Sequence, residues 1–144
     1  MEETVITGPV LIDTGILYAL ADRKDRWHAR AVDFIKGFKG KLIVPATVIP
    51  EVCYLLNAHL GAHVENAFLT SLTNRELSFE NVSLDDFARC LVILKDYQDL
   101  NIGLVDASLI AVAERLKLTR LLTTDRRHFS AIRPKHCLNL LLLP

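Results

Sequence analysis

Four carboxylates are the residues in this sequence that are best placed to do chemistry. Asp13 follows a short aliphatic run at residues 10–12, and Asp125 follows a second short run at residues 120–124. Asp106 begins a strongly periodic helical pattern, and Glu51 lies within another helical pattern. In open parallel sheets, ligands bind outside the carboxyl ends of the strands, which is where Asp13 and Asp125 are expected. The four acids are therefore candidates for one shared site.

A cluster of this kind favours a hard divalent ion. Two carboxylates about 4 Å apart repel each other by roughly 4 kcal/mol at an effective dielectric constant near 20, so a site that gathers several needs a cation or a shared proton. Oxygen ligands without a companion His or Cys select Mg²⁺ or Mn²⁺ over zinc. Such ions suit phosphodiester cleavage, because they activate water and neutralise charge on the phosphate. Spacing alone does not establish that the four acids meet in space.

Each acid also has a structural interpretation. Asp13 and Asp125 could cap the helices that follow them, and Asp106 could interact with its helix dipole, which is worth about 0.3–1 kcal/mol. Glu51 is expected on an apolar helix face, because its neighbours at three and four residues are Thr47, Val48, Tyr54 and Leu55. A buried, unpaired carboxylate is costly, so Glu51 would take up a proton, bind a cation or pair with an arginine from elsewhere.

Short apolar runs alternate with longer helical patterns along the chain. Strands are predicted at residues 9–12, 42–44, 77–82, 120–124 and 138–143. Helices are predicted at residues 16–21, 27–38, 47–60, 64–72, 83–97 and 106–118. Thr47 is expected to start its helix, and Ser83 with Asp86 resembles a capping box. This alternation predicts an α/β fold, with a mostly parallel sheet covered by helices on both faces.

The composition is that of one globular domain. The 144 residues are 51% hydrophobic and 24% charged, and we expect a single domain over residues 1–144 with a core at about 9–133. Lys and Arg together number 17, as do Asp and Glu, which excludes a protein held to nucleic acid by bulk positive charge. Any contact with nucleic acid would have to be local.

The cellular location is expected to be the cytoplasm. The three cysteines are odd in number and widely spaced in apolar surroundings, which indicates reduced core residues. The acidic start Met-Glu-Glu-Thr-Val is unlike a secretory signal. No uncharged apolar run approaches the ~18 residues that span a bilayer, so a soluble protein without a membrane partner is predicted.

Four segments carry a resemblance to a known family. They are residues 10–14, 49–52, 105–111 and 122–129, and in this order and at these intervals the chain resembles PIN-domain proteins, which include the ribonuclease toxins of toxin–antitoxin pairs. The resemblance implies a single PIN-like domain with a five-stranded parallel sheet and an acidic pocket. It puts Asp13, Glu51, Asp106 and Asp125 at the family's acidic positions, with Asp13 and Asp106 as the direct metal ligands. Thr14 matches the small hydroxyl residue that often accompanies the first acid.

The function implied by the resemblance is a Mg²⁺- or Mn²⁺-dependent endoribonuclease, the toxin of a type II toxin–antitoxin pair. It would hydrolyse phosphodiester bonds of single-stranded or loop RNA, whose bases and backbone can enter a shallow pocket. A small antitoxin that inserts a segment into the pocket and a homodimer are further expectations. The alternatives are a housekeeping RNA-processing nuclease and a catalytically silent PIN-like binding module.

Basic residues beside the acids have two interpretations. Arg126, Arg127 and His128 would lie at the pocket rim, where they could touch RNA phosphates, or they form a solvated turn. Arg23, Lys24 and Arg26 have the same two interpretations, and Trp27 is expected in the core or on a dimer surface.

Two other enzyme classes fit poorly. Asp13-Thr14-Gly15 matches the aspartic protease tripeptide, but that class needs a β-rich fold with a paired aspartate. A haloacid dehalogenase would need an aspartate where Gly15 stands.

Overall fold

Five parallel strands form one sheet with β1 at its centre. In the computed structural model, which describes residues 8–144, the strand order is β3-β2-β1-β4-β5. Every pairing between neighbours is parallel. The strands are β1 (Val10–Ile12), β2 (Leu42–Pro45), β3 (Ser78–Glu80), β4 (Arg120–Leu122) and β5 (Leu141–Leu143). The predicted parallel α/β sheet is therefore confirmed.

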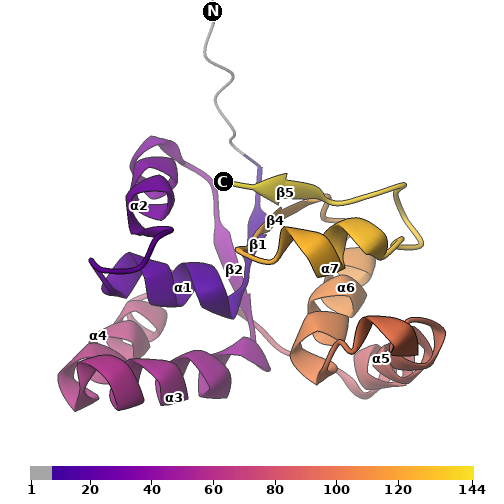
Figure 1. The fold of residues 1–144 in the computed structure, drawn as a ribbon, viewed down its shortest axis with the longest axis horizontal. Coiled ribbons are helices and arrows are strands. Elements are labelled where there is room, and N and C mark those ends of the chain that lie inside the picture. The colour runs from indigo at the N-terminus through magenta and orange to yellow at the C-terminus, as the bar shows by residue number, and fades with distance from the viewer. Residues whose placement is uncertain (1–7) are drawn as a thin grey trace, which may run out of the picture.

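Helices cover both faces of the sheet, as Figure 1 shows. One side carries α1 (Thr14–Ala21), α2 (His28–Gly37), α3 (Val48–Leu60) and α4 (Ala62–Thr73). The other side carries α5 (Leu84–Asp96), α6 (Leu104–Leu116) and α7 (Arg126–Ala131), with a short 3₁₀ turn at Gln98–Leu100 before α6. The sheet is the middle layer of three.

The central strands are buried on both faces. Val10, Leu11 and Ile12 have no exposed surface, and neither have Leu121 and Leu122 of β4. Strands covered on both sides have continuous apolar sequences instead of an alternating pattern, which is why these runs were recognisable as strands. The chain leaves the sheet after β1 and β4 at the same edge, because the two strands pair in parallel. Asp13 and Asp125 follow these two ends.

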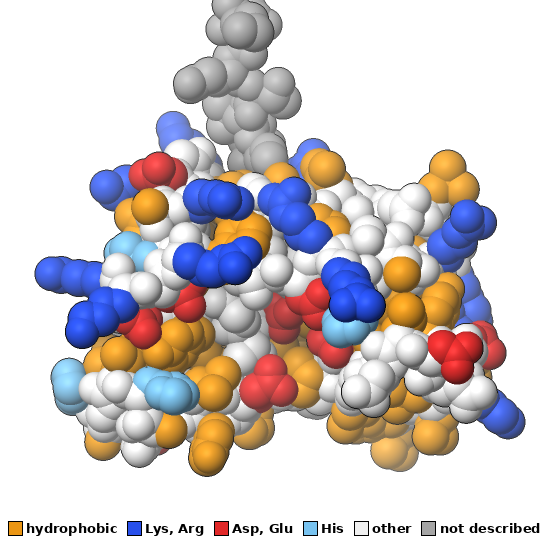
Figure 2. All heavy atoms as spheres, in the orientation of Figure 1, with side chains coloured by type: hydrophobic (Ala, Val, Ile, Leu, Met, Phe, Trp, Pro, Cys, Tyr) orange, Lys and Arg blue, Asp and Glu red, His pale blue; other side chains and the backbone are white. Residues whose placement is uncertain are grey.

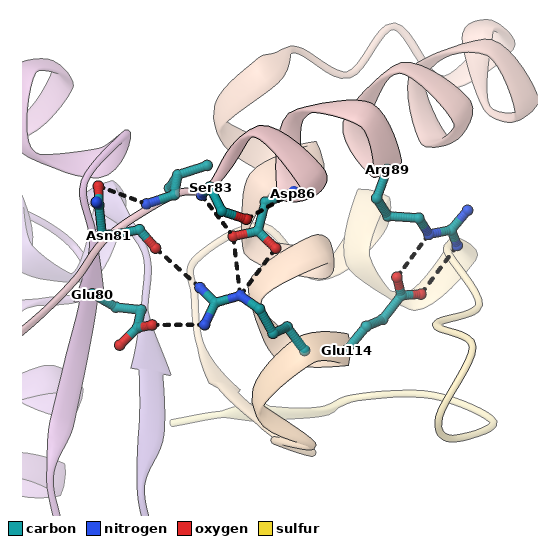
Figure 3. Close-up of polar contacts among 8 residues, drawn as sticks. Glu80, Asn81, Ser83, Asp86, Arg89 and Glu114 are labelled. Carbon is teal, nitrogen blue, oxygen red and sulfur yellow. Dashed lines mark hydrogen bonds and ion pairs between the residues drawn. The ribbon is translucent and has the colours of Figure 1, made fainter.

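Two groups of ion pairs fix α6, the helix that carries Asp106. Arg115 of α6 contacts Asp86 of α5 (3.0 Å) and Glu80 at the end of β3 (2.9 Å). On the same helix, Glu114 accepts two hydrogen bonds from Arg89 of α5, at 2.7 and 3.0 Å (Figure 3). Glu114 and Asp86 are buried, so these contacts hold α5 and α6 in one relative position.

The predicted capping box opens α5. Ser83 Oγ accepts a hydrogen bond from the Asp86 backbone (3.1 Å), and the Asp86 carboxylate accepts one from the Ser83 backbone (3.0 Å). Burial alone would raise the pKa of Asp86, but the ion pair with Arg115 and the hydrogen bond from Ser83 lower it overall. Asp86 therefore stays ionised inside the fold.

Several boundaries differ from the sequence prediction. The helix expected from Asp106 begins at Leu104, because the Asp106 carboxylate accepts a hydrogen bond from the Gly103 backbone and so caps the helix from its third residue. Thr47 precedes α3 but its side chain does not cap the helix. Its hydroxyl is hydrogen-bonded to Ser108 of α6 instead (2.6 Å). The strands expected at 77–82 and 138–143 are each only three residues long.

Two features of the described chain bear on the expected cellular location. Within residues 8–144, no helix has both the length and the apolar character needed to cross a membrane. Cys53, Cys90 and Cys137 are all free thiols, as expected. The acidic start of the chain, on which the absence of a secretory signal was argued, falls within residues 1–7 and lies outside the described residues.

Candidate functional site

Asp13 is a buried carboxylate at the end of the central strand. It is only 7% exposed. Its two oxygens accept hydrogen bonds from the Thr14 backbone (2.7 Å) and from the Thr123 hydroxyl (3.1 Å). Burial, together with the negative charges of Asp106 and Glu51, raises the pKa of Asp13 to about 6 against the lowering effect of the two hydrogen bonds. Asp13 caps α1 and also faces two other acids.

Asp106 lies in the first turn of α6 and is half-buried. One of its oxygens accepts a weak hydrogen bond from the Gly103 backbone (3.4 Å). The pKa of Asp106 is raised, first by burial and then by the negative charges of Asp125 and Glu51. The acids expected at the site therefore act on one another electrostatically, although they come from separate elements.

Asp125 precedes α7 and is held by His128. One carboxylate oxygen accepts a hydrogen bond from the His128 backbone (3.0 Å), and the other lies 2.6 Å from His128 Nδ1. This second contact is an ion pair whenever the imidazole is protonated. The capping role considered for Asp125 is thus present, and it fixes the orientation of the carboxylate.

Thr123 joins Asp13 to Asp125 and was missed by the sequence analysis. Its hydroxyl, which is fully buried, accepts a hydrogen bond from the Asp125 backbone (3.0 Å) and donates one to Asp13 (3.1 Å). The available signal was a polar residue at the end of an otherwise apolar run. Only the pairing of β1 with β4 brings this threonine to Asp13.

The burial expected for Glu51 is wrong. Glu51 is exposed in the first turn of α3. The buried stripe of this helix consists of Val48, Val52 and Leu56, and Tyr54 beside Glu51 is 72% exposed. The apolar residues three and four positions from Glu51 therefore do not place Glu51 on the buried face of α3. The charge of Glu51 still reaches Asp13 and Asp106, so its side chain borders the same space.

The resulting site is an acidic surface between the two helical sides of the molecule. Figure 2 shows acidic side chains gathered near the middle of one face. Among residues 8–144, neither Asp13, Asp106 nor Glu51 forms an ion pair with a Lys or Arg. The arginine partner considered for Glu51 is thus absent from the described part of the chain. No Lys or Arg among the described residues therefore neutralises these three acids by direct contact.

The carboxylates of this site are suitable ligands for a hard divalent ion, although their side chains do not converge on one position. Carboxylate oxygens are the ligands that Mg²⁺ and Mn²⁺ prefer. In the described part of the chain, no three His, Cys, Asp or Glu side chains are close enough to share one ion as they stand. Beside Asp13, the Thr14 hydroxyl is buried with no hydrogen-bond partner from the described residues. An unpaired polar atom next to repelling carboxylates fits a site that receives a ligand.

The basic residues expected at the rim are exposed on α7. Arg126 and Arg127 directly follow Asp125, as predicted, and both side chains are accessible. Arg126 donates a hydrogen bond to the Pro144 carbonyl, and its guanidinium lies 5.8 Å from the centre of the Trp27 ring. Trp27 is half-buried and packs against the core, as one of its two interpretations required.

Comparison with known proteins agrees with this arrangement. The sequence profile of the PIN domain matches residues 10–134. Ribonuclease VapC26 of Mycobacterium tuberculosis is 34% identical over 125 residues, which cover 87% of this chain and 93% of that protein.

Solved structures with the same fold include toxins and their complexes. Mycobacterium tuberculosis VapC20, a sarcin–ricin loop cleaving toxin, superposes with a TM-score of 0.77 at 20% identity, covering 82% of this chain and 91% of that one. A toxin–antitoxin complex from Klebsiella pneumoniae gives 0.66 at 22% identity, covering 85% and 92%. VapBC2 from Rickettsia felis, bound to a DNA fragment from its promoter, gives 0.67 at 15% identity, covering 93% and 96%. With the sheet, the acids and the profile in agreement, the chain belongs to the PIN domain family.

Proposed function

We propose that this protein is a metal-dependent endoribonuclease, a hydrolase of RNA phosphodiester bonds, and that it is the toxin of a type II toxin–antitoxin pair. The observation that carries the proposal is the mutual repulsion of acids at the carboxyl ends of the strands, with no basic partner for Asp13, Asp106 or Glu51 in residues 8–144. The 34% identity to a protein named a ribonuclease supports the choice of substrate. We propose that a single domain over residues 1–144, with its core at about 9–133, carries this activity.

The metal role is assigned to the four acids. Asp13 and Asp106 would hold Mg²⁺ or Mn²⁺ directly, because they have the raised pKa values of carboxylates in need of a cation. Glu51 and Asp125 would complete or orient the ligand shell. When bound, the ion supplies charge neutralisation for the phosphate and lowers the pKa of water.

The protein's own groups position the substrate and the acids. Thr123 holds Asp13 and Asp125 at a fixed separation through its two hydrogen bonds. His128 holds the Asp125 carboxylate from the other side. The Thr14 hydroxyl, which is buried beside Asp13 without a partner among the described residues, would donate to a water or ligand oxygen that enters the site. Arg126 and Arg127 would contact RNA phosphates at the rim.

Cleavage assays test the proposal. Purified protein is incubated with structured RNAs in Mg²⁺, in Mn²⁺ and in EDTA, beside Asp13→Asn, Asp106→Asn and the control Asp33→Asn, whose side chain is exposed on α2. We expect cleavage of loops with either ion, none in EDTA, at least a 100-fold loss in the first two variants and no loss in the control. Cleavage that persists in EDTA and in Asp106→Asn would overturn the metal mechanism.

The partners and the location belong to the same proposal. We expect a small antitoxin that inserts a segment into the acidic pocket, a homodimer, and a cytoplasmic location in which the three thiols stay reduced. Co-purification with the product of the adjacent reading frame tests the first point. A chain that cleaves RNA and has no such neighbour would be a housekeeping nuclease instead.

A silent binding module is the second candidate. It is favoured by the fact that Asp13 and Asp125 both cap helices and by the absence of a ready ion site in residues 8–144. Calorimetric titration with Mn²⁺ separates the two functions. Saturable binding that is lost in Asp13→Asn supports the nuclease, and no saturable binding supports the module.

A further inference from the structure

The guanidinium groups of three arginines lie over one tryptophan ring beside the acidic site. The guanidinium carbons of Arg30, Arg26 and Arg126 lie 4.6, 5.8 and 5.8 Å from the centre of the Trp27 ring. Trp27 immediately precedes α2, and the Asp25 carboxylate accepts a hydrogen bond from its backbone (2.8 Å), which fixes this turn. In Figure 2, Lys and Arg side chains surround an apolar patch next to the acidic side chains. We call Trp27, Arg26, Arg30 and Arg126 the arginine–tryptophan platform.

The arginines of this platform have no acidic side-chain partner in the described protein, and Arg126 donates a hydrogen bond to the Pro144 carbonyl. Among residues 8–144, none of its three arginines forms an ion pair with an Asp or Glu. All three side chains are exposed. Like charges gathered around one ring repel each other, so the arrangement is favourable only when an anion joins it or when the ring face compensates for part of the cost. The chain as a whole has no net charge, which makes this local excess distinctive.

The platform lies next to the acids in the fold as well as in the sequence. Arg126 follows Asp125 directly and opens α7. Arg26 and Arg30 come from the other side of the sheet, at the start of α2. The contact of all three arginines with Trp27 therefore bridges the two helical sides at the edge of the acidic surface. A polymer bound across the acids would extend onto this ring.

We propose that the arginine–tryptophan platform is a subsite for single-stranded RNA, in which a base flanking the cleaved bond replaces a guanidinium over the Trp27 ring and the arginines bind the adjacent phosphates. The inference rests on the proposed ribonuclease function and adds to it the site that holds the flanking nucleotide. An unstacked base presents a planar face to an aromatic ring, and arginine binds phosphate oxygens with two parallel hydrogen bonds. A duplex would hide its bases from the ring, so the subsite selects unpaired RNA.

An acidic protein segment is the other ligand that positive charge could attract, and the ring argues against it. Its carboxylates would pair with the arginines, but they carry no extended planar face to stack on the indole. RNA supplies both the anion and the planar face at neighbouring positions along one strand. The subsite therefore predicts that both the charge and the ring contribute to affinity.

Fluorescence offers a direct test because Trp27 is the sole tryptophan in the chain. The whole protein is titrated in EDTA with a short single-stranded RNA, while intrinsic fluorescence and the anisotropy of labelled RNA are recorded. We expect saturable quenching with the same Kd by both signals. Trp27→Leu should weaken binding about 5- to 100-fold, the range that stacking of one base accounts for. Trp27→Phe, which keeps a ring, should recover part of that loss.

Charge variants that keep the tryptophan test the phosphate contacts. Arg30→Gln should weaken binding and reduce the dependence of log K on log salt by about 0.7, the change for one phosphate contact on a single strand. The matched control is Arg75→Gln, which removes an exposed arginine between α4 and β3 and should leave both quantities unchanged. In Mg²⁺, Trp27→Leu and Arg30→Gln should raise KM for RNA cleavage with little change in kcat.

Three results would overturn the subsite. One is absence of quenching when RNA binds. Another is equal affinity in wild type, Trp27→Phe and Arg30→Gln. The third is equally tight binding of an acidic peptide with the same quenching, which would assign the platform to a protein partner.

Failure of the proposed function has a different signature. A wild-type protein that binds RNA through the platform but cleaves no RNA with any ion refutes the nuclease and leaves the subsite intact. A wild-type protein that cleaves RNA with unchanged kinetics in Trp27→Leu refutes the subsite alone.

Discussion

The substitution Asp13→Asn should make the protein more stable in the absence of metal. The pKa of Asp13 is raised from 3.8 to about 6, mainly because the carboxylate is buried. The folded state thus binds a proton at Asp13 more tightly than the unfolded chain does. By linkage, the free energy of unfolding falls as the pH rises between about 4 and about 6, and it stays reduced above that range.

The magnitude follows from the pKa. A rise from 3.8 to about 6 corresponds to about 3 kcal/mol of lost stability at neutral pH, at 1.36 kcal/mol per pKa unit. Asparagine keeps the hydrogen bond from the Thr14 backbone but cannot accept the Thr123 hydroxyl proton in the same way, which costs about 1 kcal/mol. The net gain is about 2 kcal/mol, or a rise in Tm of about 6 °C for a chain of this length. At about pH 4.5 only about 1 kcal/mol of the lost stability remains, which the lost hydrogen bond offsets, so the net gain should vanish.

Thermal and urea denaturation in EDTA measure this difference. Wild type, Asp13→Asn and the exposed control Asp33→Asn are compared at about pH 7.5 and about pH 4.5. Added Mn²⁺ should stabilise wild type by about 2.7 kcal/mol at 100 times Kd and should leave Asp13→Asn unchanged. The reasoning is refuted if Asp13→Asn is no more stable than wild type at the higher pH, or if its advantage is equal at both pH values.

Three further substitutions test the packing that supports the site. Gly15→Ala should cost about 1–3 kcal/mol in urea denaturation, because the added methyl group would overlap the Thr124 side chain, and Thr124→Ala should restore much of the loss in the double variant. Arg89→Met should cost about 3–5 kcal/mol at neutral pH, since it leaves the buried Glu114 carboxylate without its partner, and adding Glu114→Gln should recover part of it. The pKa of Glu114 is lowered in spite of its burial, chiefly by Arg89, so this pair stabilises the fold above about pH 4.5 and its contribution is lost as the pH falls. If Arg89→Met lowers the free energy of unfolding as much at about pH 3 as at neutral pH, that account is wrong. Thr47→Val should cost about 1 kcal/mol and lower the cleavage rate, because it removes the hydrogen bond between the start of α3 and α6, whereas Thr47→Ser should behave as wild type in both measurements.

The strands of the sheet could be predicted from the sequence because each is marked by a few consecutive residues. Strands covered on both faces consist of consecutive aliphatic residues, and those at 10–12 and 42–44 stand out between polar segments. The capping box of Ser83 and Asp86 was likewise recognisable from four neighbouring residues. Helix α6 was placed two residues late, since its capping carboxylate sits in the third position of the helix and not before it.

The site could be predicted only as a set of candidates. The sequence indicated which acids to expect, but not how strongly each is buried. Glu51 was expected on a buried face, and the structure shows that neighbouring apolar side chains such as Tyr54 are themselves exposed. Thr123 was missed because its importance arises from the pairing of β1 with β4, a contact that no local pattern reveals.

The hydrogen bond between Thr123 and Asp13 joins residues that are 110 positions apart in the chain. During synthesis, a ribosome-bound chain that ends before β4 has Asp13 but lacks both Thr123 and Asp125, and one of the two neighbours of the central strand is missing. Such an intermediate has an incomplete sheet and an incomplete set of acids. The topology therefore delays completion of the acidic surface until β4 and the following Thr123, 110 residues after Asp13, have been synthesised.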